Sequence, residues 1–401
     1  MGGGAMSMGN GASQWLMRQS SGTVFQPQSW PMPMAMQHAA GWHLMWMGQA
    51  FVVNTQQSGP RGRDATYSAN WGMLAAARDL GKGTLMIRAM LSLDPLTVRN
   101  RQYPLLFQTG ETAYGRPITD GQHPHELLME FSVQYARQLG EKTYWNIYYA
   151  PVGEPALGPA SFPHRASAME IPQAVLGHHW QDSTHIANNV ATAGITYRGK
   201  IRLEASGFRG REPDENRWNI DFGAMDSYSG RLTVFPSANW SAQVSMGRLR
   251  NPEVQHTGDV VRTTASLHHI RPKPGGNWWA ASLVWGRNYK TSEREATHAV
   301  LAEAVYPFLG RKNFATARYE WSQRDELFPA THDGHGHAYP VHAWTGGYTR
   351  DIGTFFGGMQ TGVGANVSTY VIGRELWQAY GEHPWGVQMF LRVRLRTGGQ
   401  N

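Results

Sequence analysis

The sequence contains no cysteine and no long apolar run. The absence of Cys from the 401 residues fits an oxidising envelope compartment, where stray thiols would cross-link. No stretch approaches the roughly 20 apolar residues that a membrane-spanning helix needs, which excludes a helical membrane protein. The first residues, Met1–Gly4, lack the basic and apolar regions of a signal peptide, so none is expected in this chain.

Blocks of positive charge are also missing. The formal net charge is +7, but the arginines are spread along the chain and no nucleic-acid motif accompanies them, so no nucleic-acid partner is expected. Glycine, tryptophan and tyrosine are plentiful instead, with 46, 16 and 16 residues. This composition is typical of strands, turns and interfacial aromatic residues.

A strict alternation of side chains appears near the C-terminus. In Val387–Leu395 the odd positions are all apolar, whereas the even positions carry Gln388, Phe390, Arg392 and Arg394. A strand places successive side chains on opposite faces, so one face would be apolar and the other would carry the arginines. The pattern recurs roughly every 25 residues, which predicts a closed barrel with lipid outside and water inside.

The alternation predicts about sixteen strands. Short turns such as Leu80–Gly83 and Arg350–Gly353 alternate with long polar connections, of which 96–124 and 153–187 are the longest. This asymmetry predicts an all-β, transmembrane, antiparallel up-and-down β-barrel in the cell outer membrane, with short periplasmic turns and long extracellular or lumenal loops. The candidate strands are 41–54, 66–79, 83–95, 125–138, 142–152, 188–198, 200–210, 222–235, 238–249, 258–270, 277–288, 294–307, 312–323, 340–351, 353–370 and 385–397. The last strand is expected to pair with Trp42–Val53 and close the barrel.

The first residues differ from the rest. Residues 1–40 are rich in Met and Gly and predict a flexible N-terminal arm, while 41–401 would form the barrel. Nine of the 18 methionines fall in the first fifty residues. Thioethers favour Cu(I), but methionine also serves as a flexible apolar filler, so the pattern leaves copper binding open.

Charged side chains fall on the predicted inward face. A sixteen-strand barrel has room for an aqueous channel, and such charges would select small polar solutes or ions. We expect the loops 96–124 and 153–187 to narrow this pore. The same charges could instead pair across strands and brace the wall. The predicted pore-lining residues are Arg88, Glu126, Glu130, Arg202, Glu204, Arg262, Arg318, Glu320, Arg392 and Arg394.

Histidines concentrate in the long connections. Neutral histidine is the commonest metal ligand in proteins, and imidazole together with carboxylate suits Zn or Cu. A barrel that captures copper or zinc is therefore the second hypothesis, although the spacing matches no standard motif and polar loop histidines fit equally well. No cofactor is otherwise expected. The candidate ligands are His123, His125, His164, His178, His179, Asp182 and His185. A further cluster, Thr331–His337, is expected at the surface.

A lipid hydrolase is the third hypothesis. Asp182, Ser183 and His185 have the residue types of an acyl-transfer triad. Such roles need convergence in space rather than adjacency in sequence, and no Gly-x-Ser-x-Gly elbow is present. We therefore expect no enzymatic activity and no catalytic residues.

Several segments resemble an uncharacterised family of bacterial outer-membrane β-barrel, porin-like proteins. The resemblance covers about residues 40–395 and implies the barrel fold, but no established activity. For the predicted barrel we expect as partners the lipid bilayer and lipopolysaccharide, together with a small polar solute or ion, in a monomer or a trimer. The segments that carry the resemblance are Asp120–Glu126, Ala150–Pro159, Gly177–Ile186, Gly210–Glu215 and Arg217–Asp221.

Overall fold

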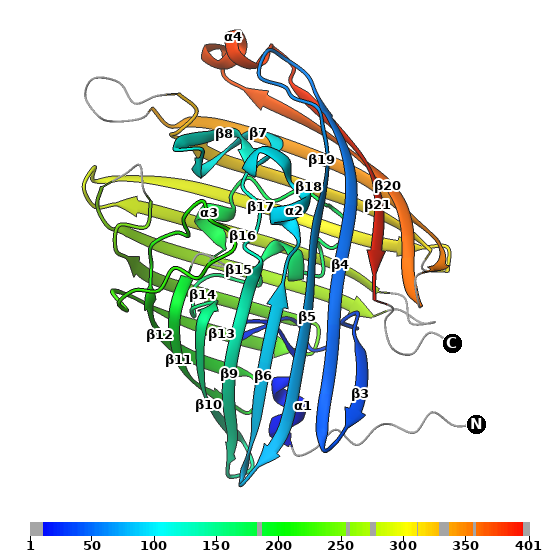
Figure 1. Ribbon diagram of the computed structural model, residues 1–401, viewed down its shortest axis with the longest axis vertical. Helices are drawn as coiled ribbons and strands as arrows, with labels where there is room; N and C mark the ends of the chain where they lie inside the picture. The colour runs from blue at the N-terminus through cyan, green and yellow to red at the C-terminus, as the bar shows by residue number, and fades with distance from the viewer. Residues whose placement is uncertain are drawn as a thin grey trace.

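Sixteen antiparallel strands form a closed barrel in the computed structural model (Figure 1). The structure describes residues 11–182, 187–253, 257–272, 278–310, 312–328, 337–355 and 358–395. The barrel closes where the last strand pairs with the first, with Gly386 opposite Gln57 and Arg394 opposite Gln49. The predicted fold class and the predicted closing pair are both confirmed.

All sixteen strands overlap the ranges that the alternation predicts. The barrel strands are β4 (Trp42–Gln57), β5 (Ala65–Leu80), β6 (Gly83–Leu91), β9 (Leu128–Leu139), β10 (Thr143–Gly153), β11 (Ala187–Tyr197), β12 (Ile201–Arg209), β13 (Ser227–Ser237), β14 (Trp240–Leu249), β15 (Val260–Pro272), β16 (Trp278–Lys290), β17 (Glu295–Phe308), β18 (Asn313–Arg324), β19 (Tyr339–Phe355), β20 (Met359–Ile372) and β21 (Trp385–Arg394). The predicted turn at Arg350–Gly353 is wrong, because β19 continues through it to Phe355. A bulge between Asp351 and Gly353 interrupts the alternation of inward and outward side chains, and the sequence there therefore resembles that of a turn.

The outer face of the barrel is apolar. On β4, Met45 and Met47 are buried inside, while Trp46 between them is 42% exposed. Val367 and Leu283 are likewise exposed on the outer face of their strands. An outward apolar surface around a closed barrel is the arrangement that a bilayer stabilises. Among the described residues, no helix is both long and apolar enough to span a membrane.

Two long connections fold into the barrel. The connection between β6 and β9 contains α2 (Asp94–Thr97), η1 (Arg99–Arg101), β7 (Tyr103–Ala113) and β8 (Arg116–Gln122). The connection between β10 and β11 contains η2 (Phe162–His164) and α3 (His178–Gln181). A third, shorter connection, between β20 and β21, contains η4 (Arg374–Leu376) and α4 (Trp377–Tyr380) and lies at one end of the barrel. Figure 1 shows β7 and β8 near one end of the barrel and the N-terminal helix near the other.

The N-terminal residues differ from the flexible arm that the composition suggests. The described part of that region forms α1 (Gly11–Leu16), β1 (Gln19–Ser21), β2 (Val24–Phe25) and β3 (Ala35–Ala39), which pairs with the start of β4. Leu16 and Met17 are buried against inward methionines of β4, β5, β6 and β9. The segment is too polar to form a core of its own, and it is ordered because the barrel wall supplies the apolar partners.

A bulge in β9 alters the predicted alternation. Met129 and Glu130 are adjacent in sequence, yet both are buried. The pairing with β6 shifts between Met90 and Leu91, so Met129 turns inward and packs among the other lumenal methionines. Because β9 begins at Leu128, Glu126 belongs to the preceding loop and not to the strand in which the sequence placed it.

Candidate functional site

Most of the predicted pore charges form ion pairs inside the barrel. Apart from Glu126, all of them lie on barrel strands, and all are buried. Arg88 Nη2 lies 2.7 Å from Glu130 Oε1 across β6 and β9, and Arg318 Nε lies 3.0 Å from Glu303 Oε2 across β17 and β18. Such pairs brace neighbouring strands. The wall is therefore charged, but its charges are largely neutralised by one another and by inserted chain.

The first inserted segment, residues 11–34, is named here the N-terminal plug. It reaches the short-turn end of the barrel, where the Ser29 amide donates a hydrogen bond to the carbonyl of Ala238 at 2.9 Å. Deeper in the lumen, the Gly22 amide donates to Glu130 Oε2 at 3.2 Å, and Arg88 donates to the Gly22 carbonyl. The wall charges thus bind the plug as well as each other.

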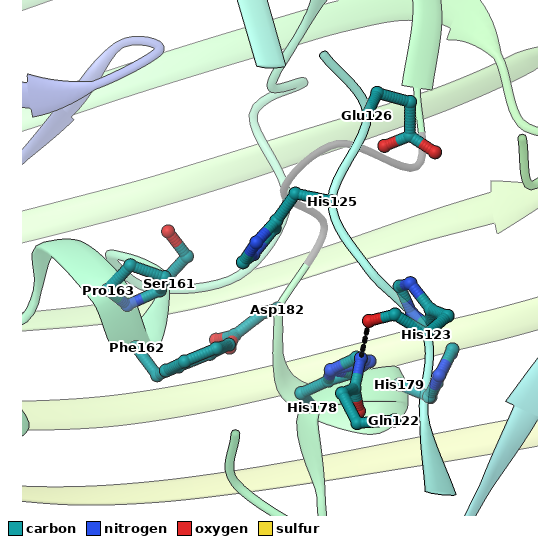
Figure 2. Close-up of a pocket in the computed structure, with 10 residues that line it drawn as sticks. All are labelled: Gln122, His123, His125, Glu126, Ser161, Phe162, Pro163, His178, His179 and Asp182. Carbon is teal, nitrogen blue, oxygen red and sulfur yellow. Dashed lines mark hydrogen bonds between the residues drawn. The ribbon is translucent and has the colours of Figure 1, made fainter. Parts of the chain in front are cut away.

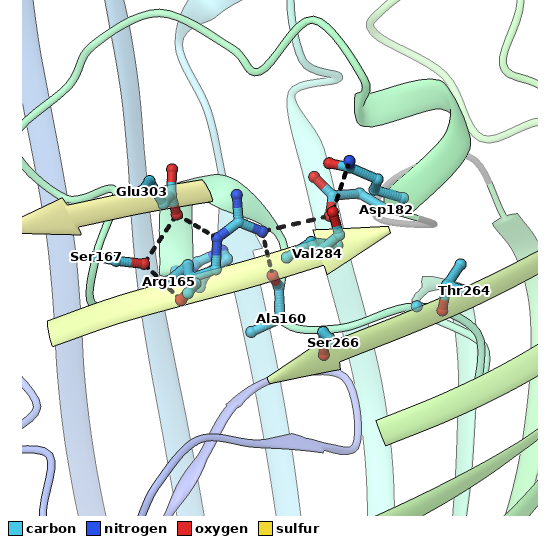
Figure 3. Close-up of polar contacts among 12 residues, drawn as sticks. Ala160, Arg165, Ser167, Asp182, Thr264, Ser266, Val284 and Glu303 are labelled. Atoms are coloured by element: carbon cyan, nitrogen blue, oxygen red, sulfur yellow. Dashed lines mark hydrogen bonds and ion pairs between the residues drawn. The ribbon is translucent and has the colours of Figure 1, made fainter. Parts of the chain in front are cut away.

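The second inserted segment, residues 154–182, is named the inner loop, and nearly all of it is buried. Figure 3 shows its Arg165 guanidinium beside Glu303 on the wall, with Nε 2.5 Å from Oε1. Its Glu170 pairs in turn with Arg392 and with Arg394, whose Nη1 lies 2.7 Å from Glu170 Oε1. Arg165 of the inner loop therefore pairs with an acidic side chain of the wall, and Glu170 of the inner loop pairs with two basic side chains of the wall.

Other predicted pore residues also hold the inner loop. Glu320 Oε1 accepts the Leu176 amide at 2.5 Å, and Arg262 Nη1 donates to the Asp182 carbonyl at 3.1 Å. Arg202 lies 2.8 Å from Glu204 on its own strand.

The β7–β8 loop, residues 92–127, fills the lumen towards the long-loop end, where buried Phe107 packs in the same apolar cluster as inward residues of β4 and β21.

A cavity of about 30 Å³ lies between the inner loop and the β7–β8 loop (Figure 2). It is lined by Gln122, His123, His125, Glu126, Ser161, Phe162, Pro163, His178, His179 and Asp182. A second cavity of about 30 Å³ shares His125, Phe162 and Pro163 with it. The two cavities therefore adjoin at these side chains, inside the barrel.

Three of the predicted metal ligands meet in the first cavity. His123 comes from the end of the β7–β8 loop, and His178 and His179 are adjacent on α3. One ring nitrogen from each lies within 4.8 Å of the other two. The ring centroids are 5.4 Å apart for His123 and His178 and 4.0 Å apart for His178 and His179.

The remaining predicted ligands do not join this group. His125 lines the same cavity, but its Nδ1 lies 2.8 Å from Asp94 Oδ2. His164 is buried elsewhere, with its ring centroid 4.2 Å from that of Trp71. Asp182 lines the cavity 3.6 Å from Arg165 Nη1. Ser183 and His185, as well as most of the Thr331–His337 cluster, lie outside the described residues.

Burial sets the protonation of the three histidines. It lowers the pKa of His123 and His178 well below the ordinary value, and it lowers that of His179. The imidazoles are therefore neutral near pH 7 and keep a lone pair each. Burial acts oppositely on nearby acids, raising the pKa of Glu111 to about 7 and that of Asp182 to about 6.

Sequence reasoning missed three charged residues around this cavity. Arg217 binds both Glu111 and Glu126, and Glu212 Oε1 lies 3.3 Å from His179 Nδ1. These residues come from β7 and from the connection between β12 and β13. Glu212 and Arg217 fall in segments that carry the family resemblance, but nothing local in the sequence places them beside the histidines.

Comparisons with known proteins identify the fold. No protein-family model matches the chain, and no curated protein matches it. The chain is similar in structure to the anion-selective porin from Comamonas acidovorans, with 11% identity and a TM-score of 0.57 over 88% of this chain and 99% of that one. It is also similar to OprB of Pseudomonas putida, with 12% identity and a TM-score of 0.53 over 88% and 94%. A third is OmpF of Salmonella typhi in complex with daunomycin, with 10% identity and a TM-score of 0.52 over 89% and 100%.

At such low identity these likenesses show the fold alone. The chain therefore has a closed sixteen-strand β-barrel fold similar to that of these porins, with an apolar outer face that suits a bilayer.

Proposed function

We propose that this protein is a porin-like channel for small polar solutes or ions, and that the N-terminal plug and the inner loop close its lumen. One observation carries the proposal. The lumen is filled by chain segments that are attached to a charged wall at discrete points, such as Arg165 to Glu303 and Glu170 to Arg392. A wall freed of these segments would present paired basic and acidic side chains to water, which is how polar pores select solutes.

The two adjoining cavities indicate a route. They are separated by Phe162 and His125, whose ring centroids are 6.3 Å apart. Both the inner loop and the β7–β8 loop contribute to this narrow point. In this proposal the inner loop must shift for a solute to pass, because most of its residues are buried against the wall.

A disulfide between the loop and the wall tests this proposal. Ser167 of the inner loop and Ser282 of β16 lie with their Oγ atoms 2.7 Å apart, close enough for Ser167→Cys and Ser282→Cys to pair after small adjustments. The chain has no native cysteine, so no other disulfide competes. The refolded double variant should give ohmic steps in planar bilayers when reduced and lose most of them when oxidised.

The single variant Ser167→Cys is the control, since it should conduct equally under both conditions. Unmodified protein that gives no ohmic steps at any voltage would rule out a channel. Oxidised double variant that conducts as well as the reduced form would rule out closure by the inner loop.

The other expectations stand as part of the same proposal. The apolar outer face supports contact with the bilayer and with lipopolysaccharide, in a monomer or a trimer. The hydrolase hypothesis gains no support, because Ser183 and His185 lie outside the described residues. The metal hypothesis has its own supporting geometry at the three histidines.

A further inference from the structure

We propose that His123, His178 and His179 bind one divalent transition-metal ion, with Zn²⁺ as the ion that suits the three imidazoles. Their ligand nitrogens lie within 4.8 Å of one another, and Figure 2 shows the three rings gathered on one side of the cavity. Zn–N bonds of about 2.0–2.1 Å would place nitrogens around one tetrahedral ion about 3.3 Å apart. Side-chain rotations that move each nitrogen by about an ångström would therefore complete the site.

His179 is already oriented for this role. Its Nδ1 faces Glu212 Oε1 at 3.3 Å, and because a carboxylate only accepts, Nδ1 carries the proton. The lone pair is then on Nε2, which is buried and has no hydrogen-bond partner among the described residues. A carboxylate behind the histidine is the usual support of a metal-bound imidazole. Gly110 leaves space beside this nitrogen, since the Cβ of any other residue there would lie 2.5 Å from it.

His123 has a matching arrangement. Its Nδ1 lies 3.2 Å from the carbonyl oxygen of Pro124, to which it donates. Its Nε2 lone pair then faces Glu111 Oε1 at 3.2 Å. Glu111 is therefore near enough to act as an oxygen ligand to a metal ion bound by His123.

A buried histidine outside this cluster has different hydrogen-bond partners. His268 faces the lumen from β15 and is buried, yet both of its ring nitrogens are bonded. Its Nδ1 lies 2.8 Å from Ser282 Oγ, and its Nε2 lies 2.9 Å from Ser266 Oγ. Among the described residues, none of the three clustered histidines has a hydroxyl partner, and one ring nitrogen of each lies within 4.8 Å of the other two. This contrast favours a metal site over a packed core cluster.

The ion would join two separate loops. His123 belongs to the β7–β8 loop, whereas His178 and His179 belong to the inner loop. Zn²⁺ bound to all three would hold the inner loop in the closed position and reduce conductance. This regulatory consequence rests on the proposed channel function, while the metal site itself does not.

Equilibrium dialysis of the full refolded chain in detergent against Zn²⁺ tests the site. A background with His332→Asn, His335→Asn and His337→Asn removes the histidines of the Thr331–His337 segment, which could also bind zinc. We expect one zinc per chain in this background. Either His123→Ala or His178→Ala should weaken the affinity at least 100-fold, whereas His268→Ala should leave it unchanged.

Circular dichroism and heat-modifiable electrophoretic mobility report whether each variant is folded. Co²⁺ added to the background protein gives a measurement that needs no alanine variant, since tetrahedral coordination produces an intense visible absorption. Absence of stoichiometric zinc, an unaltered affinity in folded His178→Ala, or no tetrahedral Co²⁺ spectrum would each refute the site.

Bilayer recordings with and without Zn²⁺ separate this inference from the channel proposal. Zinc should lower the conductance of the background protein and have little effect on His178→Ala. If the protein binds zinc but never conducts, the channel proposal fails and the site stands. If it conducts but binds no zinc, the site fails and the channel stands.

Discussion

Arg231 binds three separate parts of the chain. Its Nη2 lies 2.9 Å from Glu204 on the neighbouring strand and 2.9 Å from Thr23 Oγ1 of the N-terminal plug, and its Nη1 lies 3.0 Å from the carbonyl of Gly158 in the inner loop. A single wall side chain therefore holds both inserted segments. Removing one member of a buried ion pair is costly because the partner charge stays buried and less well compensated.

Arg231→Met should therefore destabilise the folded barrel by about 3 kcal/mol. The free energy of unfolding in urea, measured on protein in lipid vesicles, checks this value. Arg248→Met is the matched control, because Arg248 pairs with Asp259 at the exposed surface and such pairs contribute little. Equal stability of Arg231→Met and the unmodified protein would show that the buried pair is not what holds the segments.

Gly22→Ala should loosen the N-terminal plug. Gly22 has a φ of +46°, and a Cβ there would lie 2.6 Å from the Cβ of Glu154, well inside van der Waals contact. The plug must shift, at a cost of about 1–3 kcal/mol. Trypsin cleavage after Arg18, followed by mass spectrometry, reports the population in which the plug is open.

Gly72→Ala serves as the control for this substitution, since no atom lies within 4 Å of a Cβ at Gly72. Its cleavage rate should match that of the unmodified protein. Cleavage that is equally slow in Gly22→Ala would mean that the close approach at Glu154 does not restrain the plug.

At the scale of strands and loops, the sequence predicted the barrel strands, because their positions follow from the local alternation of apolar and polar side chains. Each barrel strand could be recognised because lipid and lumen impose opposite requirements on alternate side chains. The plug could not be recognised in this way, because its partners are the inward faces of strands that follow it along the chain. The bulges at Met129 and at Asp351 were also not predicted, since each adds one residue to a strand without changing the local composition.

The candidate site was predictable in part from the local composition of the sequence. The density of histidines in two long connections marked the region, and three of them do converge. Glu111, Glu212 and Arg217 carry no local signal, because their proximity to the histidines depends on how three loops fold together in the lumen.

The lipid-facing side of the strands gives a prediction at this scale. Val367 and Val371 both point outward from β20, with 51% and 59% of their surface exposed. Val371 is next to the strand end at Ile372, whereas Val367 is nearer the middle. In lipid vesicles Val367→Arg should cost about 2–4 kcal/mol and Val371→Arg about 0–1 kcal/mol. Equal effects of the two substitutions would contradict the placement of β20 in the bilayer.

For the whole molecule, the balance between closed and open lumen depends on a junction where several segments meet. Glu154 begins the inner loop and lies against Gly22 of the plug. Arg88 and Glu130 face it from β6 and β9, and Arg231 faces it from β13. The hydroxyls of Ser21 and Tyr148 complete its surroundings.

The pKa of Glu154 gives this junction a pH dependence. Burial, reinforced by the negative charge of Glu130, raises the pKa of Glu154 from 4.5 to about 7. The closed state therefore holds the proton more tightly than an opened state in which the carboxyl meets water. The resulting stabilisation is full below about pH 4.5 and is lost as the pH rises through about 7. At pH 8 a charged Glu154 repels Glu130 beside the plug, and the lumen should open more often.

Bilayer recordings at pH 5 and pH 8 test this expectation. The open probability should be severalfold higher at pH 8 in the unmodified protein. Glu154→Gln should stay near the pH 5 behaviour at both values, because its neutral amide resembles the protonated acid in shape and charge. Higher conductance at pH 5, or the same pH dependence in Glu154→Gln, would show that another group controls the opening. The difference between the two proteins isolates the effect of the single proton on Glu154.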